Sequence, residues 1–296
     1  MRISSETWNT ISTEISTLSG RSFMVESVRP VSGGDINQSF IISSHHNTAY
    51  FVKLNEAAML SMFEQEALSL NRLLNTDTFT IPVPLTHGIA QSYSYLVMSC
   101  HTIQSGGSHY ILGQKLAGLH RHTHSQHGWD HNNFIGTTMQ RNSSSANWLD
   151  FWREQRLRPQ FELAYQRGHS SKLSILADQL LSDLPRILEG HEPAPSLLHG
   201  DLWGGNVGFV APDQPILFDP ASYYGDRETD VAMTELFGGF QAEFYAGYTQ
   251  TWPLPEDYRK RKPLYQLYHM LNHLNLFGSS YFGSCKRLIN NLLNDG

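Results

Sequence analysis

The sequence predicts an α+β fold in two parts: a small N-terminal part with an antiparallel sheet and one helix, and a larger, mainly helical C-terminal part. Two observations predict it. Short β-rich runs lie before residue 100, and longer stretches with apolar residues three and four positions apart follow it. The chain has 296 residues, enough for about two domains. We expect the parts to be 1–100 and 101–296, with the boundary near residue 100 and the Gly-rich segment 105–108 as the best linker candidate.

The N-terminal part is expected to begin with a strand near 25–31. Two β-rich runs, 39–42 and 49–54, follow it with a polar turn between them and predict a hairpin. From residue 56 to 74 apolar side chains recur at helical spacing, and two prolines at 82 and 84 end that unit. The apolar run 95–98 predicts one more buried strand.

The C-terminal part shows helical patterns at 112–119, 148–164 and 173–188, and Pro159 predicts a kink or a new segment in the second. The stretch 197–220 is different, because it is Gly-rich and ends in two short apolar runs. It predicts a loop followed by a hairpin. From 229 to 293 the pattern is helical again, with an interruption at two prolines, 253 and 255.

Composition argues against several classes of protein. The chain has 21 Lys and Arg against 27 Asp and Glu, a net charge of −6, which argues against broad binding to nucleic acid or to an anionic membrane. The two cysteines, Cys100 and Cys285, are too few for a disulfide framework. No stretch approaches the roughly 18 apolar residues that span a membrane. We expect a cytoplasmic protein without a signal peptide; the sequence leaves its oligomeric state open.

The segment His-Gly-Asp-Leu-Trp-Gly-Gly-Asn at 199–206 is the most informative. Asp201 is followed by Asn206 and, after a short strand, by a second acid, Asp219. Kinase-like enzymes need this order, because phosphoryl transfer from ATP uses one carboxylate beside the attacking hydroxyl and oxygen ligands for Mg²⁺. Asp201 is therefore the candidate base, and Asn206 and Asp219 are the candidate metal ligands. The alternative is a Gly-rich turn with solvated polar side chains.

Lys53 closes an apolar strand, as the phosphate-binding lysine of a kinase does. On the helix that follows, at about 100° per residue, Glu66 falls beside the apolar stripe, about 20° from Met59, whereas Glu64 falls about 140° away. A carboxylate that faces a core needs a cationic partner. We therefore predict that Lys53 pairs with Glu66; a solvated Glu66 at the margin of the helix is the alternative.

Two further segments are candidates for nucleotide binding. Gly33 and Gly34 lie between two predicted strands, where a loop that covers phosphates belongs, although the pattern is neither Gly-x-Gly-x-x-Gly nor a Walker A loop. Met98, Ser99 and Cys100 are predicted to form the hinge between the two parts, whose backbone pairs with adenine. A plain turn and a plain strand end are the alternatives.

Several runs resemble the fructosamine kinase (ketosamine-3-kinase) family. They are Met-Phe-Glu-Gln-Glu-Ala at 62–67, Asn-Phe-Ile-Gly-Thr at 133–137, the run 151–159, the segment 198–206, Asp-Pro-Ala-Ser-Tyr-Tyr-Gly at 219–225 and Glu-Leu-Phe-Gly-Gly-Phe at 235–240. The likeness extends over most of the chain. The runs Arg-Glu-Gln-Arg-Leu-Arg-Pro and Asp-Pro-Ala-Ser-Tyr-Tyr-Gly are typical of this family within the wider group that resembles aminoglycoside and choline kinases.

The resemblance implies a two-lobed protein-kinase-like fold and phosphorylation, with ATP and Mg²⁺, of the O3 hydroxyl of a ketosamine such as fructosamine or ribulosamine. The ketosamine is a small molecule or a glycated protein lysine. In the family the 3-phosphate is unstable and frees the amine, so the implied activity is deglycation. The resemblance also implies Asp201 as the base, Asn206 and Asp219 as the magnesium ligands, and Lys53 with Glu66 as the pair that positions phosphates.

The resemblance leaves the contacts to substrate less certain. Trp203, two positions after the base, is a candidate for a flat wall against the sugar ring, with a place in the core as the alternative. Asn133 and Tyr223 are weaker candidates. Some members of the family have a Cys in the Gly-rich loop where this chain has Asp35, so redox control through that loop is not implied. We expect Asp35 to point outward or to bond to loop amides.

We interpret two clusters of side chains as structural or solvated rather than as functional. Arg153, Arg156 and Arg158 are expected on a helix face, paired with Glu154 and Glu162. The histidines at 120, 122, 124 and 127 are expected to be solvated loop side chains rather than metal ligands, because magnesium prefers oxygen.

Two other functions stay open. The first is a related small-molecule kinase that acts on an aminoglycoside, choline or another sugar. The second is a non-catalytic pseudokinase that acts as a binding module, which predicts a missing catalytic acid or magnesium ligand; this chain lacks none of them. The preferred ketosamine depends on the shape of the pocket.

Overall fold

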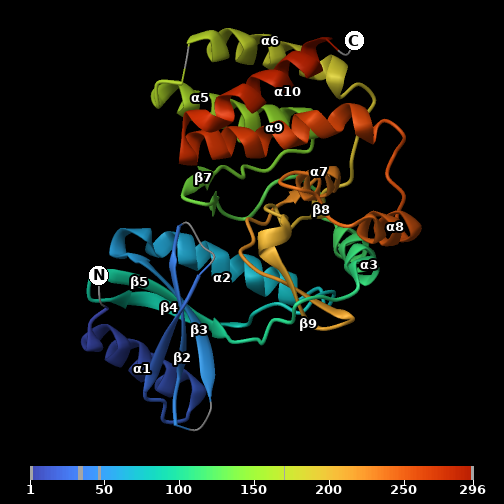
Figure 1. The fold of residues 1–296 in the computed structure, drawn as a ribbon. Coiled ribbons are helices and arrows are strands. Elements are labelled where there is room, and N and C mark those ends of the chain that lie inside the picture. The colour runs from blue at the N-terminus through green and yellow to red at the C-terminus, as the bar shows by residue number, and fades with distance from the viewer. Residues whose placement is uncertain (1–2, 33–35, 46–47, 170, 295–296) are drawn as a thin grey trace. The chain divides into compact units, whose positions relative to one another are not determined.

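Figure 1 shows the protein as a computed structural model, which describes residues 3–32, 36–45, 48–169 and 171–294. The chain divides into two compact units. Unit 1 comprises Met1–Gly107 and Gly208–Asp219, and unit 2 comprises Ser108–Val207 and Pro220–Gly296. The first boundary thus lies after residue 107 rather than near residue 100.

Residues 208–219 belong to unit 1, although the sequence places them in the helical part. The reason is backbone pairing with the N-terminal segment. Thr80 forms a parallel bridge with Ile216, and Gln104 forms an antiparallel bridge with Phe209. The hairpin of β9 (Val207–Ala211) and β10 (Gln214–Leu217), which the sequence predicts, therefore packs with residues far away along the chain.

Unit 1 is built on a five-stranded antiparallel sheet in the order β1-β2-β3-β5-β4. Its strands are β1 (Ser27–Val31), β2 (Gln38–Ser43), β3 (Ala49–Glu56), β4 (Pro84–Ala90) and β5 (Tyr93–Ser99). The hairpin expected from the sequence is the pair β2–β3. Strand β4 is not expected from the sequence, because a proline opens it; a proline is tolerated there since β4 is an edge strand.

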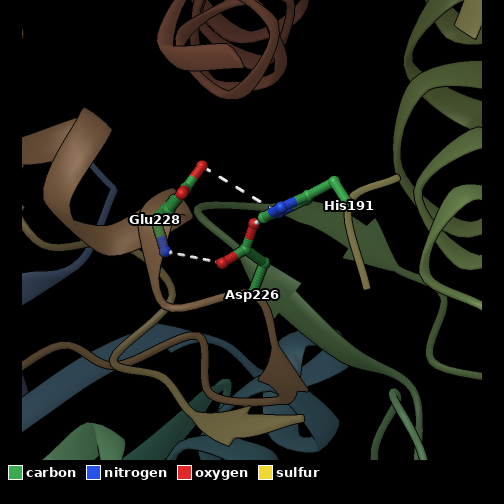
Figure 2. A group of neighbouring side chains, drawn as sticks. All are labelled: His191, Asp226 and Glu228. Carbon is green, nitrogen blue, oxygen red and sulfur yellow. Dashed lines mark hydrogen bonds and ion pairs between the residues drawn. The ribbon is translucent and has the colours of Figure 1, made fainter. Parts of the chain in front are cut away.

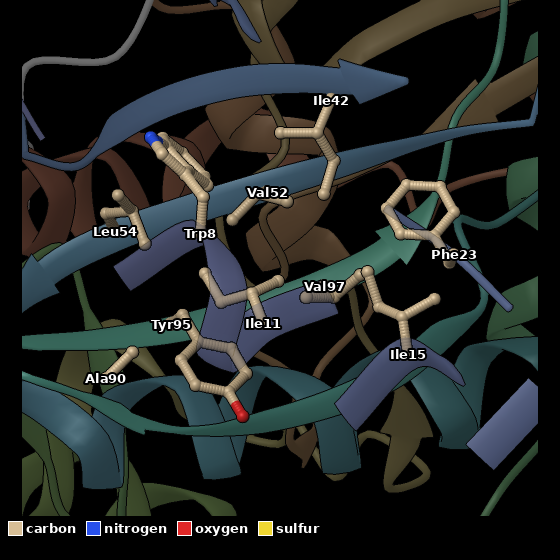
Figure 3. Close-up of a cluster of buried hydrophobic side chains, with 10 residues drawn as sticks. All are labelled: Trp8, Ile11, Ile15, Phe23, Ile42, Val52, Leu54, Ala90, Tyr95 and Val97. Carbon is tan, nitrogen blue, oxygen red and sulfur yellow. The ribbon is translucent and has the colours of Figure 1, made fainter. Parts of the chain in front are cut away.

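One face of this sheet is covered by α1 (Ser5–Ser19), a helix that our sequence analysis did not predict. Three apolar side chains on one side of α1 pack against the strands, as Figure 3 shows. The buried cluster consists of Trp8, Ile11, Ile15, Phe23, Ile42, Val52, Leu54, Ala90, Tyr95 and Val97. Apolar residues at positions i, i+3 and i+7 are typical of a helix face that buries itself against a sheet.

The second helix of unit 1 is α2 (Leu60–Leu74), which follows the 3₁₀ turn Ala57–Met59 and corresponds to the predicted helix 56–74. Successive side chains of a strand point to opposite faces of its sheet. Because Val52 and Leu54 point into the core beneath α1, Lys53 between them points to the other face, where it meets Glu66 of α2. The alternation of β3 thus decides where this lysine lies.

Unit 2 is mainly helical (Figure 1). Its elements are α3 (His109–His120), β6 (Asn133–Ile135), β7 (Thr138–Gln140), α4 (Trp148–Phe151), a π-helical turn (Trp152–Leu157), α5 (Arg158–Gln166), α6 (Ser171–Ile187), β8 (Ser196–Leu197), a 3₁₀ turn (Gly204–Asn206), β11 (Tyr224–Gly225), α7 (Glu228–Thr234), α8 (Ala242–Thr251), α9 (Tyr258–Phe277), a 3₁₀ turn (Ser279–Tyr281) and α10 (Phe282–Asn294). The strands form short two-stranded pairs, β6 with β7 and β8 with β11.

The long helix α9 organises unit 2, because it packs against α5, α7 and α10. The predicted helix 148–164 is a helical stretch from α4 to α5 that is interrupted by the π-helical turn. Pro159 lies in the first turn of α5, where its missing N–H costs no helical bond. Within the described ranges, no helix is both long enough and apolar enough to cross a membrane.

Candidate active site

Lys53, Glu66 and Asp219 form a group of charges within unit 1. Lys53 is buried, and its Nζ lies 2.6 Å from Oε1 of Glu66 and also donates to Oδ1 of Asp219. Burial lowers the pKa of Lys53, but the two carboxylates outweigh it and raise that pKa above its usual value. Burial raises the pKa of Glu66, with Lys53 opposing and Asp219 adding to the effect. The lysine is therefore a firmly charged cation between two acids.

Asp219 is held at the end of β10 by the backbone. The N–H of Leu217 donates to the carbonyl of Thr80, so the strand before Asp219 is fixed to the rest of unit 1. Asp219 itself has a φ of 57°, in the left-handed region that aspartate enters more readily than most residues. Its side chain is 45% exposed. A carboxylate that is fixed at its backbone and open at its side chain suits the coordination of a cation.

The other nucleotide candidates are described only in part. Residues 33–35, which include both glycines of the predicted phosphate loop, lie outside the described residues. Met98 is buried within β5, and the N–H of Ser99 is committed to the carbonyl of Val83 at 2.9 Å. Cys100 is half-buried and follows the end of the sheet, and burial raises the pKa of its thiol. Of the three hinge candidates, Cys100 is therefore the one whose backbone lies beyond the strand.

The loop that carries Asp201 lies in unit 2 and is braced by Asp230 of α7. The two oxygens of Asp230 accept the N–H groups of His199, at 2.7 Å, and of Gly200, at 2.9 Å. Burial raises the pKa of Asp230, but the hydrogen bond from His120 at 3.2 Å and the nearby donors outweigh it and lower that pKa. An ionised, buried carboxylate thus fixes the backbone immediately before Asp201.

Gly200 is required in this loop for two reasons. Its φ is 86°, a conformation that strains residues with a side chain. A Cβ at this position would also lie 2.0 Å from the carbonyl oxygen of Ala221. The N–H of Ala221 in turn donates to the carbonyl of His199 at 2.9 Å, so the two segments touch through their backbones.

Asp201 itself is partly open to solvent, with 22% of its side chain exposed. Asn206 closes the loop, because its Nδ2 donates to the carbonyl of Asp201 at 2.8 Å and approaches Oδ2 at 3.4 Å. On α9, Nδ1 of His269 lies 3.9 Å from Oδ1 of Asp201. Burial lowers the pKa of His269 to about 3, so this imidazole is neutral at pH 7 and adds no charge beside the carboxylate.

The side-chain oxygens of Asn206 and Asp219 fit Mg²⁺, the cation that the predicted phosphoryl transfer would use. The amide oxygen of Asn206 and the carboxylate of Asp219 are hard oxygen ligands of the kind that Mg²⁺ takes. Since Nδ2 of Asn206 is committed within its loop, the amide oxygen is the atom suited to bind a cation. Each residue, taken by itself, has the chemistry of a magnesium ligand.

The three substrate candidates differ in exposure. Trp203 is 38% exposed and meets Phe237 edge to face, with ring centroids 6.4 Å apart. Asn133 is buried and donates to the carbonyl of Ser222 at 2.8 Å, and Tyr223 is buried beneath the guanidinium of an arginine. We therefore interpret Asn133 and Tyr223 as buried packing residues rather than as contacts to substrate. Trp203 remains the candidate for contact with substrate.

Two plainer expectations are corrected by the structure. His120 and His127 are buried rather than solvated, because His120, the last residue of α3, contacts Tyr248 and Asp230, and His127 packs against Trp148. Among the arginines, Arg158 pairs with Glu154 at 2.8 Å as expected, but Arg156 is fully buried. Arg156 shares the buried side of this helical stretch with Trp152 and Gln160, four residues away in each direction, whereas Arg158 lies about 200° from Arg156 and stays on the exposed side.

A second charged cluster in unit 2 contains His191, Asp226 and Glu228, whose ligand atoms lie within 4.8 Å of one another (Figure 2). Arg261 binds both oxygens of Glu228, at 2.8 and 2.7 Å. Oδ2 of Asp226 accepts from His191 at 2.6 Å and from Tyr265 at 2.5 Å. A metal ion would compete with these donors and face the guanidinium. We therefore interpret the cluster as a buried charge network that ties α7 to α9.

Two positioning residues escaped the sequence analysis, Asp230 and His269. A signal for the first was present, because Asp230 directly precedes the apolar run 231–233, where an acid that becomes buried needs a bonding partner. No comparable signal existed for His269, since a histidine among aromatic and apolar residues is usually a core residue.

The chain is similar along nearly its whole length to known proteins. The model of the fructosamine kinase family matches residues 7–295. A Synechocystis protein named "Probable ketoamine kinase" is 42% identical over 290 residues, which cover 97% of each chain. The chloroplastic protein-ribulosamine 3-kinase of Arabidopsis thaliana is 37% identical over 283 residues, covering 93% of this chain and 85% of that one. Both relatives are named as phosphotransferases, which confirms the predicted class of enzyme.

Solved structures confirm the fold class. A Haemophilus somnus protein, provisionally named a fructosamine-3-kinase, superposes with a TM-score of 0.89 at 30% identity and covers 98% of both chains. An ADP-bound aminoglycoside phosphotransferase, 15% identical, superposes with a TM-score of 0.61 over 99% of this chain and 97% of that one, and so shares the protein-kinase-like fold. The chain belongs to the fructosamine kinase family.

Proposed function

We propose that this protein transfers the γ-phosphoryl group of ATP to the O3 hydroxyl of a ketosamine, and that it thereby removes sugar adducts from amines. The observation that carries the proposal is the complete set of charged and amide groups in a member of this family: Lys53 with Glu66 and Asp219, and Asp201 with Asn206. The ketosamine follows from the relatives, one of which is named a protein-ribulosamine 3-kinase.

In the proposed reaction, Asp201 accepts the proton of the attacking hydroxyl. The backbone bonds from His199 and Gly200 to Asp230 fix the loop in advance, so little reorganisation is needed during the reaction. The neutral His269 adds no positive charge beside the carboxylate and so does not reduce its ability to take a proton.

Lys53 offsets the negative charge of the nucleotide phosphates, and Glu66 holds the lysine in place for this role. Asn206 and Asp219 would hold the magnesium ion, which neutralises charge on the phosphates when it is bound. The backbone at Cys100 and the glycines at 33 and 34 would contact the adenine and the phosphates. Trp203 would face the sugar ring, as its exposure allows.

A substrate panel with coupled detection of ADP tests this function. We expect turnover with ribulose-lysine or fructose-lysine, and release of the free amine afterwards. Phosphorylation of choline or of an aminoglycoside without turnover of either ketosamine would overturn the proposal and favour a related small-molecule kinase. The cytoplasmic location expected from the sequence belongs to the same proposal and is checked by cell fractionation.

A further inference from the structure

The π-helical turn Trp152–Leu157 is the starting point, because such turns are rare and frequently mark functional sites. It brings Gln155 and Arg156 to a surface cavity of about 260 Å³ within unit 2. The rest of the cavity is lined by β7 and the residues on either side of it, by α5, and by Tyr268 of α9. The family motif Arg-Glu-Gln-Arg-Leu-Arg-Pro thus forms one wall of a cavity that the proposed chemistry does not use.

Three of the residues that line this cavity each have a buried polar atom with no hydrogen-bond partner among the described residues. These atoms are Oγ1 of Thr138, Oε1 of Gln155 and Nε of Arg156. A buried polar group without a partner costs about 1–3 kcal/mol, so native proteins rarely keep several in one place. The three atoms comprise a hydroxyl, an acceptor and a charged donor, and together they point to a polar ligand.

Of these three residues, Arg156 gives the strongest indication of a ligand. Its side chain is 0% exposed, and its terminal nitrogens donate to the carbonyls of Arg141 and Gln155 and to Oδ1 of Asn142. These acceptors are all neutral. The guanidinium also stacks on the ring of Tyr223, 3.9 Å from its centroid. A buried cation with neutral partners gains strongly from an anion, because its burial otherwise has no opposite charge to offset it.

Most of the remaining charged side chains of the cavity are also positive. Arg141 and Arg167 also line it, with Glu162 as the acid, so three arginines stand against one carboxylate. Guanidinium groups bind carboxylates and phosphates through paired N–H bonds. We propose that this cavity binds a small anion that carries a carboxylate or a phosphate group. Gln155 and Thr138 would then bond to hydroxyl or amine groups beside the acid.

The cavity is connected to the loop of Asp201 through α9. Tyr268 lines the cavity, and its neighbour His269 lies 3.9 Å from Asp201. With this connection, the anion could come from either of two sources. One is an acidic group of the substrate, such as the free carboxylate of a glycated amino acid, an option that rests on the proposed function. The other is a free anion such as inorganic phosphate.

Isothermal titration with inorganic phosphate and with acetate, without nucleotide or Mg²⁺, tests the site itself. We expect the wild-type protein to bind at least one of the two anions, and the double variant Arg141→Gln/Arg167→Gln to bind it at least tenfold more weakly. These arginines are exposed, so the variant keeps its fold; Arg156→Met should abolish binding if it folds. Arg158→Gln, on the same helix but paired with Glu154, is the matched control and should bind as the wild type does.

The control for the nucleotide site is Lys53→Met. Anion binding that persists in this variant belongs to the cavity. The proposal is overturned if the wild type binds neither anion at tens of millimolar, if the double arginine variant binds unchanged, or if Lys53→Met abolishes the binding. None of these results depends on catalytic turnover, so the proposal fails independently of the proposed function.

A kinetic comparison distinguishes the two sources. Glycated Nα-acetyl-lysine with a free carboxylate is compared with its amide, in the wild type and in the Arg141→Gln/Arg167→Gln variant. A lower KM for the carboxylate that disappears in the variant, with kcat unchanged, assigns the cavity to the substrate. Equal KM values in both proteins, together with phosphate binding by titration, assign it to a free anion.

Discussion

Two groups of candidate catalytic residues, one in each unit, are held in opposite ways. In unit 1, Lys53 lies between two carboxylates, and each charge keeps the others in place. In unit 2, Asp201 is positioned through its backbone, and a separate carboxylate, Asp230, supplies the bracing. In unit 1 the same residues therefore hold the structure and carry the proposed chemistry, whereas in unit 2 different residues do so. Substitutions should change stability and activity together in the first group, whereas in the second a substitution of Asp201 should change activity alone.

The largest effect on activity is expected for Asp201→Asn. The amide is isosteric but does not take a proton, so kcat should fall by about 10²–10⁴-fold, the usual contribution of a general base. The free energy of unfolding and the Kd for nucleotide should stay near their wild-type values, because the loop is held by Asp230. Steady-state kinetics and nucleotide titration check both parts; a kcat within threefold of wild type would contradict the assignment.

Lys53→Met should lower activity and stability together. It leaves Glu66 buried without its cation, and breaking such a buried pair by removing one partner costs about 3–5 kcal/mol. Chemical denaturation measures this loss. The double variant Lys53→Met/Glu66→Gln should recover much of the stability, because the uncompensated charge is gone, but none of the activity. Full recovery of activity in the double variant would show that the pair is structural only.

Asp230→Ala should loosen the loop of Asp201. The buried N–H groups of His199 and Gly200 lose their acceptor, and each orphaned donor costs about 1–3 kcal/mol. We expect a clear loss of stability by urea denaturation and a fall in kcat of about tenfold with a smaller change in KM. Asp230→Asn keeps one acceptor oxygen and should retain more of both. Wild-type kcat in the alanine variant would refute the bracing role.

A smaller effect is expected from pH. Burial lowers the pKa of His269 to about 3 and that of His127 to about 4, whereas an unfolded histidine has a pKa near 6.5. Below about pH 6.5 the unfolded chain therefore binds protons that the native state does not take up. Stability should fall as the pH drops toward 4, by up to about 1.4 kcal/mol per pH unit for each group.

Urea denaturation of wild type and His127→Gln at pH 7, 6 and 5 checks this expectation. The variant should lose stability less steeply than the wild type between pH 6 and pH 5, because one of the proton-binding groups of its unfolded state is removed. The same slope in both proteins would mean that His127 is already protonated in the native state.

Much of unit 1 could be predicted from the period of its apolar residues. The hairpin β2–β3 and the helix α2 follow from the pattern, and the phase of α2 selects Glu66 over Glu64 as the partner of Lys53. The edge strand β4 could not be predicted, because its first residue, Pro84, is usually read as the end of an element. Position at the edge of a sheet is a property of the whole fold and not of the local sequence.

In unit 2 the segment that carries Asp201 and Asn206 could be predicted as a loop from the sequence, but the burial and contacts of the side chains around it could not. A helical wheel at about 100° per residue already places Arg156 and Arg158 on opposite sides, but it gave no reason to expect the guanidinium of Arg156 on the buried side, since charged side chains are rarely fully buried. The burial of His120 depends on contact with Asp230, 110 residues away along the chain. Such long-range contacts leave no periodic signal in the sequence.

Mass spectrometry of ribulose- and fructose-modified lysines, before and after incubation with enzyme and Mg-ATP, tests the central claim most directly. We predict that the modified lysine first gains one phosphate group and then returns to the mass of the free lysine, and that Asp201→Asn prevents both changes. Modified lysines that keep their mass with the wild-type enzyme, while ATP is consumed on another acceptor, would contradict the assignment of this protein as a ketosamine kinase.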